Sequence, residues 1–155
     1  MSINPHAFML LGPVGAGKST LFQALLGHVA VVRKTQAAEF ENGCIDTPGE
    51  YFSHPRLYHA LINTCSSVDT IVYVHPCNDL EHRLPPGLLT IYEGKRLIGV
   101  ITKTDLPDGR PDQIEEMLRD NGFSGPIFRI SNRDQRSVEC LRTYLLGDPQ
   151  HRMPA

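Results

Sequence analysis

A glycine-rich segment near the N-terminus has the residue types and spacing that bind a polyphosphate. It reads GPVGAGKST and follows the apolar run AFMLL. Glycines let the backbone curl so that consecutive N–H groups point inward, and a following helix adds positive potential at its N-terminus. We expect Lys18 to contact the β- and γ-phosphates, Ser19 to bind Mg²⁺ and Thr20 to reach the α-phosphate. The predicted phosphate loop consists of Gly12, Pro13, Val14, Gly15, Ala16, Gly17, Lys18, Ser19 and Thr20.

Two later segments supply candidates for the Mg²⁺ and γ-phosphate contacts. In IDTPG, Asp46 can hold a Mg²⁺-bound water, and the N–H of Gly49 can approach the γ-phosphate without a side chain in the way. A simple Pro-Gly turn is the alternative interpretation. Thr35, in VVRKTQAAEF, stands where a mobile loop would close on Mg²⁺ and the γ-phosphate. The predicted Mg²⁺ contacts are therefore Ser19, Thr35 and Asp46.

The segment TKTD at 102–105 follows the apolar run RLIGVI and is a candidate base reader. The Asp105 carboxylate can accept the N1–H and N2–H₂ donors of guanine, whereas adenine presents no such donor pair, which favours GTP over ATP. The Lys103 stem can lie along the base while its ammonium reaches toward the phosphate loop. Thr102 stands where many GTPases carry Asn, so base selectivity is expected to be softened. The alternative is a solvated Lys-Asp loop.

Ser131 follows the apolar run PIFRI and is the candidate for a backbone contact with the guanine oxygen. The pair Ser-Asn at 131–132 also suits a plain turn, which is the alternative interpretation.

Alternating strand-like and helix-like segments must position these residues. They predict a three-layer α/β fold of the P-loop NTPase type, with a mostly parallel sheet of about six strands covered on both faces. Strands are predicted near 6–11, 40–46, 68–75, 96–102 and 126–130, with a further short strand near 36–41 that turns through Asn42-Gly43 as an antiparallel edge hairpin. Helices are predicted at 18–27, 54–66, 111–121 and 135–146, and 76–94 is read as a long connection with at most one short helix.

Length and composition predict one intracellular domain. The chain has 155 residues, 41% hydrophobic and 21% charged, so we assign residues 1–147 to a single nucleotide-binding domain and 148–155 to a flexible tail. A net charge of −2 and a pI near 6.4 argue against nucleic acid or a membrane surface as the main partner. No apolar run is long enough to span a bilayer, and a cytoplasmic location is expected. The four widely spaced cysteines indicate reduced thiols rather than a metal site or disulfides.

Several long segments carry a family resemblance. They are GPVGAGKSTLFQALLG, RKTQAAEF, IDTPGEYFSHPRLYHALI, RLPPGLL and TKTDLP. Over nearly its full length the chain resembles the EutP/PduV family of ethanolamine- and propanediol-utilisation proteins, and it looks closer to the ethanolamine branch. The resemblance implies a Ras-like fold, a role in ethanolamine catabolism, and association with bacterial microcompartments, whose shell or pathway proteins would be partners. It also implies an acetate kinase activity that interconverts ATP and acetate with ADP and acetyl phosphate.

The residue after Gly49 bears on the reaction. Many Ras-like enzymes carry a Gln there that orients water, whereas this chain has Glu50, whose carboxylate can align a water or accept its proton. The bulky Val14 stands where Ras-like proteins have Gly and argues against the usual arginine-finger geometry. Unassisted turnover should therefore be slow. The catalytic candidates are Lys18, Thr35 and Glu50.

Acetate kinase chemistry makes a different demand on the site. A cation should hold acetate in line with the γ-phosphate, and Arg33, Lys34 and Arg56 are the candidates by sequence. Glu50 would repel acetate unless it is protonated or paired, for instance with Arg56. The residues taken alone favour a slow GTPase-like switch, while the resemblance favours the kinase. A nucleotide-dependent docking module with negligible turnover is the third alternative.

Overall fold

The computed structural model describes residues 4–13, 15–25, 39–41, 44–46, 68–81, 94–131 and 133–146, and every structural statement below refers to these. The strands are β1 (Asn4–Leu11), β2 (Glu39–Glu41), β3 (Cys44–Asp46), β4 (Val68–Pro76), β5 (Arg96–Thr102) and β6 (Ile127–Arg129). The helices are α1 (Lys18–Leu25), α5 (Pro111–Asp120) and α6 (Gln135–Leu146). The α/β class predicted from the sequence is confirmed.

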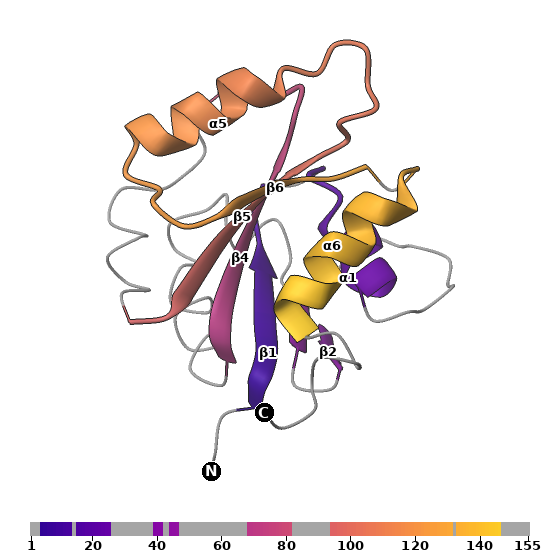
Figure 1. Cartoon of the computed structure of the whole chain (residues 1–155), viewed down its shortest axis with the longest axis vertical. Helices are drawn as coiled ribbons and strands as arrows, with labels where there is room; N and C mark the ends of the chain where they lie inside the picture. The colour runs from indigo at the N-terminus through magenta and orange to yellow at the C-terminus, as the bar shows by residue number, and fades with distance from the viewer. Residues whose placement is uncertain are drawn as a thin grey trace.

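A parallel sheet forms the centre of the molecule (Figure 1). Its strands lie in the order β2-β3-β1-β4-β5-β6. The strands β1, β4, β5 and β6 are parallel neighbours in this order, and β3 pairs parallel with β1 on its other side. The short β2 runs antiparallel to β3, with Phe40 opposite Ile45. Because these strands are parallel, the carboxyl ends of β1, β3, β4, β5 and β6 lie at the same edge of the sheet.

Helices cover both faces of this sheet because successive side chains of the central strands point to opposite faces. On one face α5 packs against a buried cluster, and on the other α1 and α6 pack against a second cluster (Figure 1). The first cluster includes Met9, Leu11, Ile71, Tyr73, Ile101, Ile114 and Leu118. The second includes Phe8, Leu10, Leu21, Phe22, Val72, Val74, Val100, Val138 and Leu141. Within β1, Met9 and Leu11 belong to the first cluster, whereas Phe8 and Leu10 belong to the second. The neighbouring residues of β4 alternate between the two clusters in the same way.

Several predicted boundaries need correction. The strand predicted at 40–46 is shorter, because residues 39–41 form β2 and only Cys44–Asp46 form β3. These two strands pair antiparallel. The predicted turn at 42–43, the helix at 54–66, the short helix within 76–94 and the tail at 148–155 lie outside the described residues. Within the described part of the chain, no helix is long and apolar enough to cross a bilayer.

Candidate nucleotide-binding site

The phosphate loop joins the carboxyl end of β1 to the first residue of α1. Gly12 has a φ of 156°, and a Cβ there would collide with the carbonyl oxygen of Val74 in the neighbouring β4. Gly17 has a φ of 85°, a conformation that residues with a side chain rarely adopt. The glycines thus serve both the turn and the close approach of the loop to the sheet. Val14 lies outside the described residues.

The start of α1 presents the residues predicted to hold phosphates. Lys18 is the first residue of the helix and is 7% exposed, while Ser19 and Thr20 are half-buried. The first backbone N–H groups of a helix lack partners within it and carry partial positive charge, which favours anions. A polyphosphate lying against the loop would therefore meet backbone donors, the Lys18 ammonium and two hydroxyls.

The predicted Mg²⁺ contacts are only partly within the described residues. Asp46 ends β3, which runs parallel to β1 with Asp46 in register with Leu10, so Asp46 lies at the same edge of the sheet as the phosphate loop. Hydroxyl and carboxylate oxygens, as in Ser19 and Asp46, are ligand types that suit Mg²⁺ held together with phosphates. The other predicted contact, Thr35, lies outside the described residues. Within the described segments, no group of three or more His, Cys, Asp or Glu forms a metal site.

Some further sequence-predicted residues are not placed. Gly49 and Glu50 lie outside the described residues, and so do the three cations considered for acetate: Arg33, Lys34 and Arg56. Their roles stay predictions.

Thr102 and Lys103 join the predicted base-reading segment directly to the predicted phosphate loop. Thr102 ends β5, is 6% exposed, and donates its Oγ1 hydrogen to the carbonyl oxygen of Ala16 over 2.7 Å. The Lys103 ammonium donates to the carbonyl oxygen of Gly15 over 2.8 Å. Two segments far apart in the sequence are thus tied by a hydroxyl and an ammonium at the carboxyl ends of β1 and β5.

Asp105 lies beside Ser131, whose backbone contact with the guanine oxygen stays a prediction. The Ser131 hydroxyl donates to Asp105 Oδ1 over 2.8 Å, and the Arg133 Nε lies 3.6 Å from Asp105 Oδ2. The hydrogen bond from Ser131, assisted by the positive charge of Arg133, lowers the pKa of Asp105. The carboxylate is therefore ionised at neutral pH. Ser131 positions this carboxylate with its side chain, a role that the sequence did not indicate.

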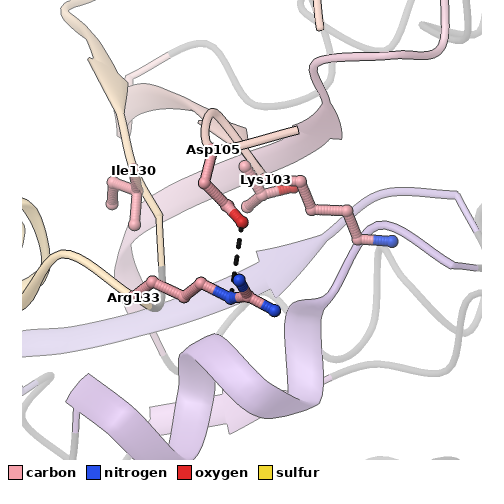
Figure 2. A pocket seen from close by; sticks show the side chains of 5 residues that line it. Lys103, Asp105, Ile130 and Arg133 are labelled. Atoms are coloured by element: carbon pink, nitrogen blue, oxygen red, sulfur yellow. Dashed lines mark ion pairs between the residues drawn. The ribbon is translucent and has the colours of Figure 1, made fainter. Parts of the chain in front are cut away.

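A pocket of about 120 Å³ opens at this point, lined by Thr102, Lys103, Asp105, Ile130 and Arg133. Figure 2 shows the Asp105 carboxylate pointing toward the Arg133 guanidinium, to which a dashed line joins it, while the Lys103 side chain extends away from both. Ile130 and Arg133 line this pocket although neither was predicted as a site residue. Their signal in the sequence was that they lie within two residues of Ser131, which was itself predicted to contact the base.

The chain also matches known proteins over most of its length. The model of the PduV-EutP family, described as "Ethanolamine utilisation - propanediol utilisation", matches residues 6–147. A Salmonella typhimurium protein named "Probable acetate kinase EutP" is 55% identical over 136 residues, 87% of this chain and 86% of that protein. The Escherichia coli protein of the same name is 54% identical over the same shares. The "Propanediol utilization protein PduV" of Citrobacter freundii is 37% identical over 137 residues, 88% of this chain and 91% of its own. The resemblance seen in the sequence is confirmed, and the chain belongs to the PduV-EutP family of ethanolamine- and propanediol-utilisation proteins.

Proposed function

We propose that this protein is a Mg²⁺-dependent, nucleotide-binding phosphotransfer protein of ethanolamine catabolism that acts as a slow GTPase-like switch. The observation that carries the proposal is the direct link between the phosphate loop and the base-reading segment through Thr102 and Ala16. One rigid unit can then contact both the phosphates and the base of the same nucleotide.

The preference for guanine rests on Asp105. A carboxylate has two oxygens with two lone pairs each, and the Ser131 hydroxyl uses one of them on Oδ1. The Arg133 Nε lies 3.6 Å from Oδ2, so each oxygen would keep a lone pair with which to accept one of the paired N1–H and N2–H₂ donors of guanine. The lowered pKa of Asp105 favours this interaction, because only the ionised carboxylate accepts at both oxygens.

The phosphates and Mg²⁺ would be held at the opposite end of the site. Lys18 would contact the β- and γ-phosphates, and Ser19, Thr35 and Asp46 would hold Mg²⁺ directly or through water. Bound Mg²⁺ would neutralise charge that develops on the phosphates. Gly49 would contact the γ-phosphate, and Glu50 would align the attacking water. The alternative of a nucleotide-dependent docking module shares this site but requires negligible turnover.

An acetate kinase is the second candidate, and the observation that favours it is the name "Probable acetate kinase EutP" of relatives 54–55% identical to this chain. In that reaction an acetate oxygen would bond to the γ-phosphorus of ATP. The bond from that phosphorus to the bridging oxygen would break, giving acetyl phosphate and ADP. Arg33, Lys34 or Arg56 would hold the acetate.

Two measurements on the purified full-length chain separate these candidates. Titration with GTP and ATP in the presence of Mg²⁺ tests the base preference, and equal affinities would refute the guanine assignment. Incubation with nucleotide, Mg²⁺ and acetate, followed by trapping with hydroxylamine, detects acetyl phosphate as the hydroxamate. Phosphate release without hydroxamate supports the GTPase, hydroxamate supports the kinase, and tight binding with neither product supports the docking module.

The proposed partners require a separate test. Association with a microcompartment predicts that the protein sediments with purified ethanolamine-utilisation compartments in a nucleotide-dependent way. Recovery only in the soluble fraction with every nucleotide would contradict it.

A further inference from the structure

The backbone of the base-reading segment takes an unusual conformation at Lys103. Its φ is 63°, and among the described residues it is the one non-glycine residue with positive φ. Such a conformation is unfavourable for a residue with a side chain, so neighbouring contacts must hold it. Lys103 lies between Thr102, which donates a hydrogen bond to Ala16, and Asp105, which lines the pocket. The conformation of Lys103 therefore affects how these two residues are placed relative to each other.

The carbonyl oxygen of Lys103 accepts two hydrogen bonds. One comes from the backbone N–H of Leu106 over 3.0 Å, which closes the turn itself. The other comes from the thiol of Cys77, whose Sγ lies 2.9 Å from that oxygen. Cys77 follows the last residue of β4 and is 0% exposed, so this thiol reaches the turn from the neighbouring strand.

The backbone of Cys77 holds both ends of the same loop. Its N–H donates to the carbonyl oxygen of Thr102 over 2.9 Å, and its carbonyl oxygen accepts from the N–H of Arg110 over 2.8 Å. Gly109 packs against the thiol so closely that a Cβ there would lie 2.5 Å from Sγ. The loop from 102 to 110 is therefore folded around Cys77, with the thiol at its centre.

The surroundings of the thiol keep it a donor. Burial, with the nearby Asp108 carboxylate adding a smaller effect, raises the pKa of Cys77. The group is thus a protonated thiol at neutral pH, and only that form can donate to a carbonyl oxygen.

We propose that Cys77 is a positioning residue for base recognition. The hydrogen bond from its thiol to the Lys103 carbonyl oxygen holds the turn that orients Asp105 toward the base. The proposal deepens the proposed function and rests on it for the nucleotide readout. Cys77 touches no nucleotide itself. Its loss should weaken guanine recognition while leaving the phosphate contacts of Lys18 and Ser19 intact.

The test compares Cys77→Ala, which removes the donor, with Cys77→Ser, which retains one, and with Cys140→Ala as the matched control at an exposed cysteine of α6. Affinities for GTP, ATP and inorganic tripolyphosphate are measured for each variant. Cys77→Ala should bind GTP about three- to tenfold more weakly, as expected for one lost hydrogen bond. Its tripolyphosphate affinity should not change, and Cys77→Ser should recover much of the GTP affinity. Equal weakening toward all three ligands, or no recovery in the serine variant, would overturn the proposal.

A second measurement does not depend on nucleotide. Amide hydrogen exchange at Leu106, whose N–H shares the Lys103 carbonyl with the thiol, should be faster in Cys77→Ala than in wild type and close to wild type in Cys77→Ser. If wild type binds GTP and ATP equally, the proposed function fails, while this difference still supports the positioning role. Unchanged exchange in Cys77→Ala refutes the positioning role whatever the nucleotide preference.

Discussion

The hydroxyl of Thr102 donates a hydrogen bond to the carbonyl oxygen of Ala16 over 2.7 Å, inside the protein and between two segments that lie far apart in the sequence. Many GTPases carry Asn at the position of Thr102. Here the shorter hydroxyl contacts the predicted phosphate loop, three residues before Asp105, the predicted base reader.

Thr102→Val tests this contact. The substitution keeps the branched shape but leaves the buried Ala16 carbonyl without its side-chain donor. We expect the free energy of unfolding to fall by about 1–2 kcal/mol, with a parallel loss of GTP affinity. Urea unfolding and nucleotide titration measure the two effects. Thr143→Val, at an exposed position of α6, is the matched control, and an equal effect there would show that the hydrogen bond is not the cause.

Lys18→Met tests the phosphate contact while preserving most of the alkyl stem. Loss of a charged donor should weaken GTP binding by about ten- to a hundredfold, within the range for hydrogen bonds to charged groups. The control is Lys95→Met, because Lys95 precedes β5 at the opposite edge of the sheet and donates to the Val68 carbonyl oxygen. If both variants bind GTP as tightly as wild type, the predicted phosphate loop does not hold the nucleotide.

Asp105→Asn tests the reading of guanine. The amide replaces an acceptor by a donor, so GTP affinity should fall by about tenfold or more. Xanthosine triphosphate presents a carbonyl in place of the 2-amino group, and its affinity should rise in the same variant. Competition titrations measure the affinities for GTP and xanthosine triphosphate in wild type and in the variant. Loss of affinity for both nucleotides alike would indicate a structural role for Asp105 instead.

Ser131→Ala tests the cause of the lowered pKa of Asp105. The Ser131 hydroxyl stabilises the ionised form, so its removal should raise the pKa of Asp105 toward the ordinary value of 3.8. Because the pKa of Asp105 is lower in the folded state, the hydrogen bond from Ser131 stabilises the fold above pH 3.8. This stabilisation is lost as the pH falls through the folded-state pKa of Asp105. The variant should therefore be less stable than wild type at neutral pH and equally stable in strong acid.

Carbon-detected NMR titration of the Asp105 carboxyl measures this shift. Ser137→Ala is the control, because its hydroxyl contacts the backbone at Ser131 and Asp134 rather than the Asp105 carboxylate. A pKa that stays low in Ser131→Ala would assign the shift to Arg133 or the backbone.

Glu50→Gln separates the two phosphoryl acceptors. If acetate is the acceptor, removal of the negative charge should lower the KM for acetate, because like charges no longer repel. If water is the acceptor, the variant should change phosphate release and show no acetate dependence, since Gln at this position can orient water. Hydroxamate formation and phosphate release are measured on the same samples, with nucleotide affinity as the control. An unchanged rate in both assays would show that Glu50 takes no part in the reaction.

The sequence by itself determined the parts of the site that depend on local backbone chemistry. Gly12, Gly17 and Lys18 predict a phosphate loop because glycines at this spacing permit a tight turn before a helix, and in the structure the turn lies between β1 and α1. The alternation of strand and helix patterns determined the α/β class, because each pattern follows from which side chains are buried. Long matching segments likewise determined the family.

Tertiary structure alone decided which side chains meet. The hydroxyl of Thr102 lies against Ala16, and the Ser131 hydroxyl against Asp105, because parallel pairing brings the carboxyl ends of β1, β5 and β6 to one edge of the sheet. The thiol of Cys77 meets the Lys103 carbonyl for the same reason, although the sequence predicted only a reduced cysteine. Local patterns depend on neighbours along the chain, whereas these contacts depend on strand order and register, which no short segment encodes.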